Sequence, residues 1–267
     1  MKRLFFIILL INITTTIFAQ KNLIIKVNNV DFEMIFVEHG TFVMGATEEQ
    51  RNDRDIDENP YHTVKLTNDF YIAKYEVTQK LWKAVKGKLP QDMNNLDSKF
   101  LGDDLPVVCV SWNDAIDFIN DLNQLTGKKF RLPTEAEWEF SARGGNKSQH
   151  YKFSGSNKLD EVGWNQNMFE HYSIDCPQKV GTKSPNELGI YDMSGNVWEW
   201  CNDWYSSAYY HQTSKKDPKG PSDNENCAFK VYRGGSFHFI ERECRVSCRN
   251  CDYPKQRSNN LGFRLAL

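Results

Sequence analysis

The sequence predicts one α+β domain that contains much irregular structure. Three observations support this prediction: two helix starts carry capping boxes, short strand-like runs surround them, and hydrophobic periodicity mostly fades after Gly144. Gly, Asn, Ser and Pro then separate short aromatic runs, and neither a linker nor an internal repeat is visible. We therefore expect a single domain over residues 20–267, preceded by a targeting segment at residues 1–19.

The N-terminus has the pattern of a signal peptide. Lys2 and Arg3 precede the apolar run Leu4–Ile11, and a Thr-rich tail ends at Ala19. The apolar run is too short to span a bilayer and is interrupted by Asn12, and no cysteine directly follows the predicted cleavage point. We expect an exported protein, periplasmic or extracellular after cleavage, with neither a lipid anchor nor a transmembrane segment.

Strands and loops are expected in the first quarter of the chain. Residues 20–30 are interpreted as a short leader, and the alternation over residues 32–44 predicts one or two strands. The charged segment at residues 48–59 predicts an exposed loop. Residues 62–66 and 70–76 are interpreted as the two strands of one hairpin.

Capping residues then predict three helices. Thr78 caps a short helix that ends at Gly87. Ser111 and Asp114 form a capping box directly after the apolar run at residues 105–110, which predicts a strand. Thr134 pairs with Glu137 in a second capping box. Three glutamates in that first turn suit the helix dipole, so capping explains them without a catalytic role. The chain ends on a predicted buried strand at residues 261–267.

Composition excludes some functions. The chain has 267 residues, a net charge of −2 and a pI of about 6.3, and no basic patch is visible. Nucleic acid and anionic membranes are therefore not expected partners. Aromatic residues make up 13% of the chain, which is typical of a core built from large rings held by irregular loops.

Seven cysteines follow the predicted signal peptide. Because export permits disulfides, we expect most of them to form structural disulfides, with at least one thiol left over from an odd number. Cys248 and Cys251 have the spacing of a redox or metal pair. They lack the strand-to-helix setting of a thioredoxin site and a second pair for zinc.

The stretch at residues 189–205 is the most unusual in the chain. It contains three Trp and two Tyr among glycines, asparagines and acidic residues, a pattern that fits neither a plain strand nor an amphipathic helix. Asp192 and Glu199 flank a Gly-Asn turn. Carboxylates beside free carbonyls suit a hard cation such as calcium. The alternative is a solvated acidic loop over a Trp core.

A series of short motifs runs in order along nearly the whole mature chain. The motifs lie at residues 40–45, 75–78, 106–112, 131–139, 195–200, 233–237 and 261–264. In this order they resemble the formylglycine-generating enzyme, or sulfatase-modifying factor, family. The resemblance implies a C-type-lectin-like fold with long ordered loops. It also implies a calcium site at Asp192, Gly195, Val197 and Glu199, with Gly and Val contributing carbonyls.

The resemblance also implies an activity: some family members are oxidases that hold a copper ion between two cysteines. The first of these cysteines corresponds to Phe239 in this chain, and the second falls near Cys244, where about three residues are missing. A strand would place Cys244 and Cys248 about 13 Å apart, too far for one metal. Cys201 and Cys244 are alternatively expected to form a disulfide. The copper oxidase chemistry is therefore expected to be absent.

Two functions remain open at this point. The first is an exported binding or accessory domain that takes a protein or peptide, with a sulfatase as one candidate, or a glycan, on loops around Trp198, Ser236 and Arg245. The alternative is a formylglycine-generating oxidase that uses copper, Cys244 and Ser236. The family's iron-dependent oxygenases form a third class. They carry their histidine ligands in an extra helical domain, and the six histidines of this chain are scattered.

Overall fold

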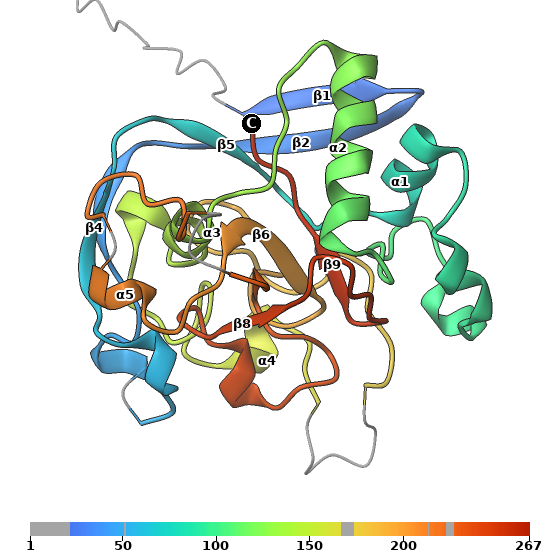
Figure 1. Ribbon diagram of the computed structural model, residues 1–267. Coiled ribbons are helices and arrows are strands. Elements are labelled where there is room, and N and C mark those ends of the chain that lie inside the picture. The colour runs from blue at the N-terminus through green and yellow to red at the C-terminus, as the bar shows by residue number, and fades with distance from the viewer. Residues whose placement is uncertain (1–21, 51, 167–173, 213, 223–226) are drawn as a thin grey trace, which may run out of the picture.

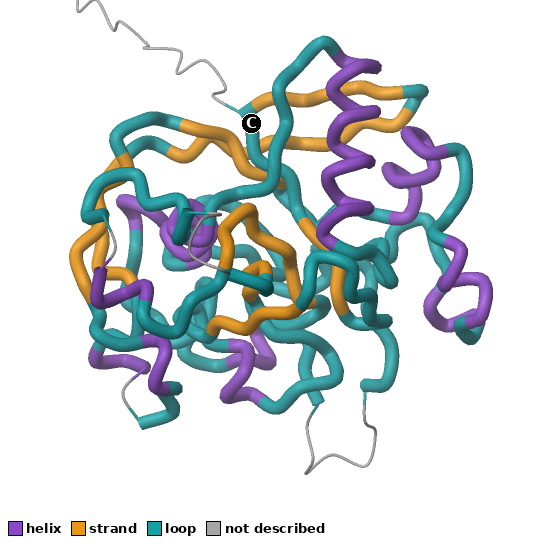
Figure 2. Tube along the Cα trace, in the orientation of Figure 1, coloured by secondary structure: helices purple, strands orange, loops and turns teal. Residues whose placement is uncertain are grey.

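The computed structural model describes residues 22–50, 52–166, 174–212, 214–222 and 227–267 (Figure 1). The α-helices are α1 (Gln79–Lys86), α2 (Trp112–Thr126), α3 (Glu135–Ala142), α4 (Leu159–Val162) and α5 (Tyr209–Gln212). The strands are β1 (Leu23–Val27), β2 (Val30–Val37), β3 (Gly40–Met44), β4 (His62–Leu66), β5 (Phe70–Ala73), β6 (Trp198–Trp204), β7 (Lys230–Arg233), β8 (Arg249–Asp252) and β9 (Leu261–Phe263). The mixture confirms the predicted α+β class, and loops connect most elements (Figure 2).

The strands of the first quarter form a bent two-stranded ribbon with an added edge. β3 pairs with β4, β2 pairs with β5, and β1 adds to the outer edge of β2. The predicted hairpin between residues 62–66 and 70–76 is therefore wrong. The chain bends at residues 67–69 rather than turning back, and Asp69 accepts a hydrogen bond from the His39 N–H across the ribbon. The predicted leader also contains a strand, β1.

The predicted helix caps are confirmed. The Thr78 hydroxyl accepts from the Leu81 N–H, and Ser111 and Thr134 form reciprocal capping boxes with Asp114 and Glu137. α2 packs beside α1 and β1 in the upper part of the molecule (Figure 1). These helices are specified by local side chains, which is why the sequence predicts them well.

The apolar run at residues 105–110 is buried but is not a strand. Its one β-bridge, between Thr78 and Pro106, is isolated and does not extend into a ladder, and Cys109 adopts a positive φ of 57°. The run instead lies against β9, because the Val107 carbonyl is close to Gly262. Hydrophobic content alone therefore predicted its burial correctly and its conformation wrongly.

A four-stranded sheet carries the region that resembles the copper site. Its order is β8-β7-β6-β9, with β6 and β9 parallel and the other pairs antiparallel. Aromatic rings pack on it and beside it: Trp82 stacks on Phe118 at 5.0 Å, and Phe263 meets Phe118 edge to face. No helix among the described residues is long and apolar enough to cross a membrane.

The close approach of β9 to residues 105–110 gives a stability prediction. A methyl group at Gly262 would lie 2.5 Å from the Val107 carbonyl oxygen, so Gly262→Ala should destabilise the fold by about 1–3 kcal/mol in urea unfolding. The control is Gly102→Ala, whose methyl would meet only Leu105 at 3.4 Å. Equal stabilities of the two variants would contradict the packing described.

Candidate functional site

The region that resembles the copper site runs from β7 through a tight turn to β8. Gly234 and Gly235 both have positive φ, and a methyl group on Gly235 would collide with the backbone and thiol of Cys244. Glycine is therefore required for this turn to lie against the segment that carries Cys244. Ser236 follows and is fully buried, with its hydroxyl oxygen accepting hydrogen bonds from Asn260 Nδ2 and the His238 N–H.

Phe239 is part of an aromatic cluster. Its ring meets Trp198 edge to face at 5.6 Å, and Trp198 in turn meets Tyr232 at 5.1 Å. The indole N–H of Trp198 is buried without a hydrogen-bond partner. The position that resembles the first copper cysteine is thus filled by a ring that packs on its neighbours.

Cys244 lies in an apolar environment. Its side chain is fully buried in a cluster with Phe153, Leu159 and Val162. Burial, reinforced by the nearby charges of Glu243 and Glu241, raises the pKa of the Cys244 thiol far above its ordinary value. The thiolate that copper or a nucleophilic reaction requires is therefore strongly disfavoured.

The expected disulfides are absent among six of the cysteines. Free thiols are present at Cys109, Cys176, Cys201, Cys244, Cys248 and Cys251. Cys201 packs in a different hydrophobic cluster from Cys244, so the expected bond between these two is not formed. Cys248 belongs to a third cluster, with Trp198 and Trp200.

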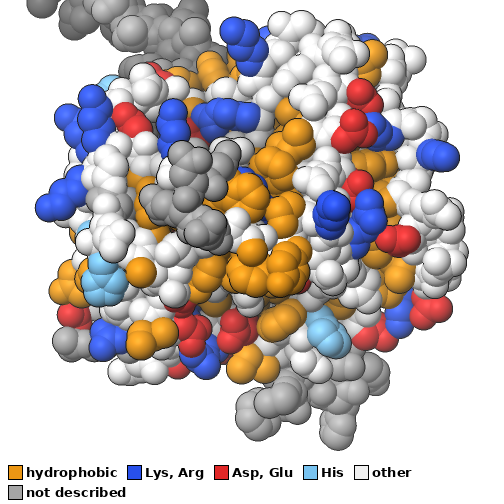
Figure 3. Space-filling model, in the orientation of Figure 1, with side chains coloured by type: hydrophobic (Ala, Val, Ile, Leu, Met, Phe, Trp, Pro, Cys, Tyr) orange, Lys and Arg blue, Asp and Glu red, His pale blue; other side chains and the backbone are white. Residues whose placement is uncertain are grey.

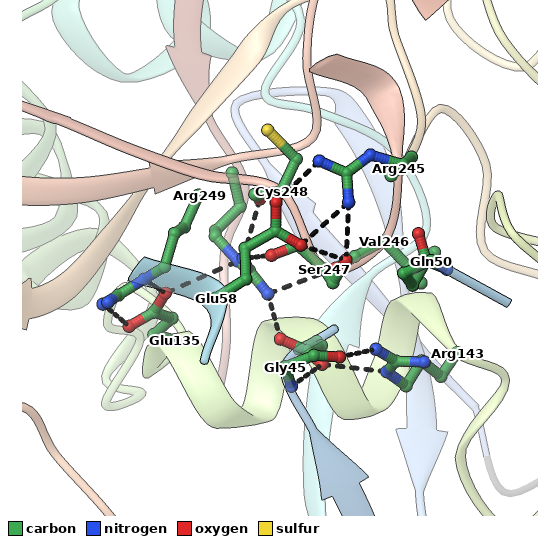
Figure 4. A network of polar contacts seen from close by, with 12 residues as sticks. Gly45, Gln50, Glu58, Glu135, Arg143, Arg245, Val246, Ser247, Cys248 and Arg249 are labelled. Atoms are coloured by element: carbon green, nitrogen blue, oxygen red, sulfur yellow. Dashed lines mark hydrogen bonds and ion pairs between the residues drawn. The ribbon is translucent and has the colours of Figure 1, made fainter. Parts of the chain in front are cut away.

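The segment at residues 245–249 is held by buried ion pairs (Figure 4). Arg245 pairs with Glu58 through two hydrogen bonds of 2.6 and 2.8 Å, and Arg249 pairs with Glu135 through bonds of 2.7 and 2.8 Å. Arg233 donates to the carbonyls of residues 246, 247 and 248. The segment is therefore fixed along its whole length.

The roles of these carboxylates are not visible in the sequence. Glu58 was expected in an exposed loop but is completely buried, and its pKa is lowered because Arg245 and Ser247 hydrogen-bond to it against the effect of burial. Glu135 and Glu139 were assigned to helix capping. Glu139 is fully buried, accepting from Arg233 and Arg143 and from the Gly45 N–H.

A further buried carboxyl lies at the N-terminus of α3. Asp203 accepts a hydrogen bond of 2.9 Å from the Glu135 N–H. Burial, followed by the charge of Glu135, raises the pKa of Asp203 to about 8. At neutral pH this carboxyl is therefore mostly protonated.

The residues predicted to contact a ligand are all buried. Trp198 is 2% exposed, and Ser236 and Arg245 are 0% exposed. Arg245 is fully engaged with Glu58, Ser247 and the Arg242 carbonyl. Direct contact between these three side chains and a ligand stays a prediction. Accessible side chains of the region are Ile240 and His238, with Phe239 half-buried.

The two carboxylates predicted for calcium, Asp192 and Glu199, are both buried, and a calcium site at Asp192, Gly195, Val197 and Glu199 stays a prediction. Both oxygens of Glu199 are engaged, by Arg264 at 2.6 Å each and by the Trp138 indole N–H at 2.7 Å. Asp192 accepts from the Gly181 N–H at 2.7 Å, and its second oxygen is buried without a partner. The Val197 N–H donates to Glu76, a buried carboxyl that no sequence pattern marks as part of this region.

Three buried carboxyl groups, those of Glu76, Asp192 and Glu199, lie near one guanidinium, that of Arg264. Burial, and then the charges of Asp192 and Glu199, raise the pKa of Glu76 well above its ordinary value. Burial raises the pKa of Asp192 to about 6. In the described part of the chain, the one group of three potential metal ligands within 4.8 Å is Asp55, Glu58 and Cys248, where Arg242 and Arg245 already pair with the carboxylates.

Several proteins of known name are similar to this chain. The model of the family described as Sulfatase-modifying factor enzyme 1-like domain matches residues 24–267. Chaperone protein LppX of Paenibacillus barcinonensis is 33% identical over 278 residues, which cover 86% of each chain. The formylglycine-generating enzyme of Streptomyces coelicolor is 40% identical over 173 residues, which cover 60% of this chain and 52% of the enzyme. The match thus spans about half of that enzyme's length.

A solved structure confirms the fold. Treponema denticola variable protein 1 has a TM-score of 0.78 and 30% sequence identity, covering 93% of this chain and 99% of that one. The predicted C-type-lectin-like fold, built here as one α+β domain, is therefore confirmed.

The buried pair of Arg245 and Glu58 gives a second prediction. Arg245→Met leaves Glu58 buried without a counter-charge and should destabilise the protein by about 3–5 kcal/mol in urea unfolding. Adding Glu58→Gln removes that charge and should recover part of the loss. If the free energy of unfolding of Arg245→Met lay within about 1 kcal/mol of the wild-type value, Glu58 would be solvated rather than buried.

Asp203 gives a pH prediction. Its folded-state pKa is near 8 and its ordinary value is 3.8, so the folded state holds a proton that the unfolded state has lost between these values. The stability that this group contributes is complete below about pH 4 and is lost as pH rises to about 8. Asp203→Asn keeps the oxygen that accepts from Glu135 and removes the titration. The stability difference between wild type and variant should change across this pH range, and parallel profiles would contradict the assignment.

Proposed function

Because the chain belongs to the sulfatase-modifying factor family, we propose that it is an exported binding or accessory member without the two-cysteine copper oxidase. The observation that carries this proposal is the arrangement of Phe239 and Cys244. Phe239 supplies a packed ring where the resemblance places the first thiol, and Cys244 faces an apolar cluster. Cu(I) bound by two thiolates needs both sulfurs deprotonated and directed at one point, so the side chains present do not fit that metal.

Buried contacts also restrict movement of the segment that carries Cys244 and Cys248. Arg233, Arg245 and Arg249 fix the backbone of residues 245–249, and Gly235 lies directly against Cys244. Arg245 and Arg249, on either side of Cys248 in the sequence, are held in buried ion pairs, and breaking such pairs is unfavourable. The formylglycine-generating oxidase stays the alternative, and it would require a second thiolate to reach Cys244.

We define the aromatic face as the outward side of β6 and β7 together with the adjoining rings of Trp112, Trp204, Tyr232, Phe239 and Tyr253. Lys230 lies between Trp112 and Trp204, 4.2 and 3.8 Å from their ring centroids. Tyr253 is 57% exposed and packs on Phe229 at 4.6 Å. Hydrophobic side chains gather across the middle of this side of the molecule, over β6 and β8 (Figure 3).

A protein or peptide is the partner that best suits the aromatic face. Tyr, Trp and other aromatic side chains are enriched in the centres of protein interfaces, where they bury much area with little loss of side-chain freedom. The name of the chaperone relative is consistent with a role that acts on other proteins. The predicted signal peptide, residues 1–19, lies outside the described residues, and export is part of the proposal.

An oxidase assay tests the first half of the proposal. The mature protein, loaded with Cu(I), is incubated in air with a peptide that carries the sulfatase-type Cys-x-Pro-x-Arg motif, and the products are identified by mass spectrometry. We expect no aldehyde, because Phe239 stands where the first thiol is implied and Cys244 packs among apolar residues. Aldehyde formation that is lost in Cys244→Ser and retained in Cys109→Ser would overturn the proposal.

A binding assay tests the second half. Peptides selected from a random displayed library should bind the protein, and Tyr253→Ala should weaken that binding by about tenfold or more. Leu125→Ala, which removes a similarly exposed side chain from α2, should leave it unchanged. Selection of no peptide, or equal loss in both variants, would contradict binding at the aromatic face. Glycan binding in place of peptide binding would assign the face to the other partner class.

A further inference from the structure

Four exposed lysines gather at the outer edge of β4. A later segment of the chain runs beside this edge: the Lys65 N–H donates to the Lys215 carbonyl at 2.8 Å, and the Asp217 N–H donates to the Lys65 carbonyl at 3.0 Å. The resulting parallel bridge places Lys65 directly opposite Lys216. Basic side chains are visible together over this part of the molecule, at the upper left of Figure 3. We define the lysine row as Lys65, Lys215, Lys216 and Lys219.

The positive charges of the lysine row are largely unbalanced in the described part of the chain. All four side chains are exposed, and none takes part in an ion pair with a described carboxylate. Asp217 lies among them in sequence, but its carboxylate accepts from the Thr67 N–H at 2.7 Å and from the Thr67 hydroxyl at 2.6 Å. Against the effect of burial, these bonds and then the charges of Lys216 and Lys219 lower the pKa of Asp217, so this carboxylate offsets part of the charge.

The opposed pair of Lys65 and Lys216 does not stabilise the fold. Side chains directly opposite each other on paired segments lie close together, and like charges in such positions repel. The backbone hydrogen bonds of Lys65 nevertheless hold the two residues side by side. A partner that brings negative charge would relieve this repulsion, so the arrangement favours binding of an anion.

The surface beside the lysine row is polar and carries no acid. Thr41 is paired with Lys65 across the ribbon, and Val43 and Thr63 continue the same outward face. Neither β3 nor β4 contains an acidic residue. An anionic ligand on the row would therefore meet hydroxyl groups on this side and no repelling carboxylate from these two strands.

A polar hollow of about 500 Å³ adjoins the lysine row, which is within the range of ligand pockets. Lys219 lines it together with Asn68, Thr134 and Asn202. Amide and hydroxyl groups both donate and accept hydrogen bonds, as the hydroxyls of a sugar require. The acidic side chains of the hollow already have partners: Asp69 with His39, Glu137 with Arg131, and Asp217 with Thr67.

We propose that the lysine row binds an anionic polysaccharide, one that carries sulfate or carboxylate groups, and that the hollow holds a neighbouring sugar. Lysine ammonium groups are compact charges without a fixed bonding geometry, which suits a repeating polyanion. The lysine row belongs to elements other than those of the aromatic face, so this inference does not depend on the proposed binding function.

Two other polyanions fit the surface less well. A peripheral membrane site combines basic residues with large apolar side chains that enter the lipid, and among the outward side chains of β3 and β4 the apolar one is Val43, 39% exposed. Single-stranded nucleic acid is bound by stacking bases on aromatic rings, and the outward side chains of these two strands include no ring.

The experiment measures binding of the mature protein to three forms of one polymer by isothermal titration calorimetry. Neutral dextran should not bind, whereas dextran sulfate or carboxymethyl dextran should bind with an affinity that falls as salt is raised. Lys65→Gln combined with Lys216→Gln should weaken that binding by about tenfold. The matched control is Lys26→Gln combined with Lys88→Gln, which removes two exposed lysines from β1 and from the turn after α1 and should leave the affinity unchanged.

Thermal unfolding separates loss of contact from loss of folding. Because Lys65→Gln with Lys216→Gln relieves a repulsion, its Tm without polymer should be no lower than that of wild type. Equal losses of affinity in the two double variants would overturn the proposal, because binding would then follow net charge alone. Absence of binding to both charged dextrans would also overturn it. Binding of phosphatidylglycerol vesicles or of DNA in their place would assign the row to that other class of partner.

Discussion

The fold depends on buried pairs of arginine and glutamate that join distant segments of the chain. Arg233 pairs with Glu139, Arg245 with Glu58, Arg249 with Glu135 and Arg264 with Glu199, and all eight side chains are nearly or completely buried. A domain with few regular elements has many backbone carbonyls that no helix or sheet satisfies. The planar guanidinium, with five donors, satisfies a carboxylate and several such carbonyls at once.

These pairs explain why long loops can be ordered here. Arg233 binds three successive carbonyls before β8, and Arg264 binds carbonyls from two segments that are far apart in the sequence. Buried ion pairs add little net stability compared with apolar residues, but loss of one partner is strongly unfavourable. The pairs therefore act mainly by specifying one arrangement of the loops, and substitutions that separate the partners should be poorly tolerated.

The sequence predicted features that are encoded locally. The caps at Thr78, Ser111 and Thr134 set the three main helices, because each cap uses side chains within three residues of one another. Strand pairing in the bent ribbon was mispredicted because it depends on whether residues 67–69 turn or continue. The roles of Glu58 and Glu135 were missed because their arginine partners lie 187 and 114 residues away. A charged residue in a loop or first helical turn looks solvated until such a partner is known.

The candidate site also combines a feature that the sequence predicts with features that depend on distant parts of the chain. Phe239 was predicted to replace a copper ligand by position alone, and the packing of its ring on Trp198 is consistent with that prediction. The burial of Cys244 and the engagement of Glu199 by Arg264 arise from long-range packing that no local pattern contains. A shared fold thus carries a different set of side chains at the positions where chemistry would occur, so function has to be argued from those side chains.

The most direct measurement is a titration of the reduced mature protein with Cu(I) in competition with a chromophoric chelator. We expect no tight stoichiometric site that depends on Cys244, so wild type and Cys244→Ser should lose copper to the chelator equally. A tight one-to-one site with thiolate-to-copper absorption, abolished by Cys244→Ser, would contradict the claim that this chain lacks the two-thiolate copper centre.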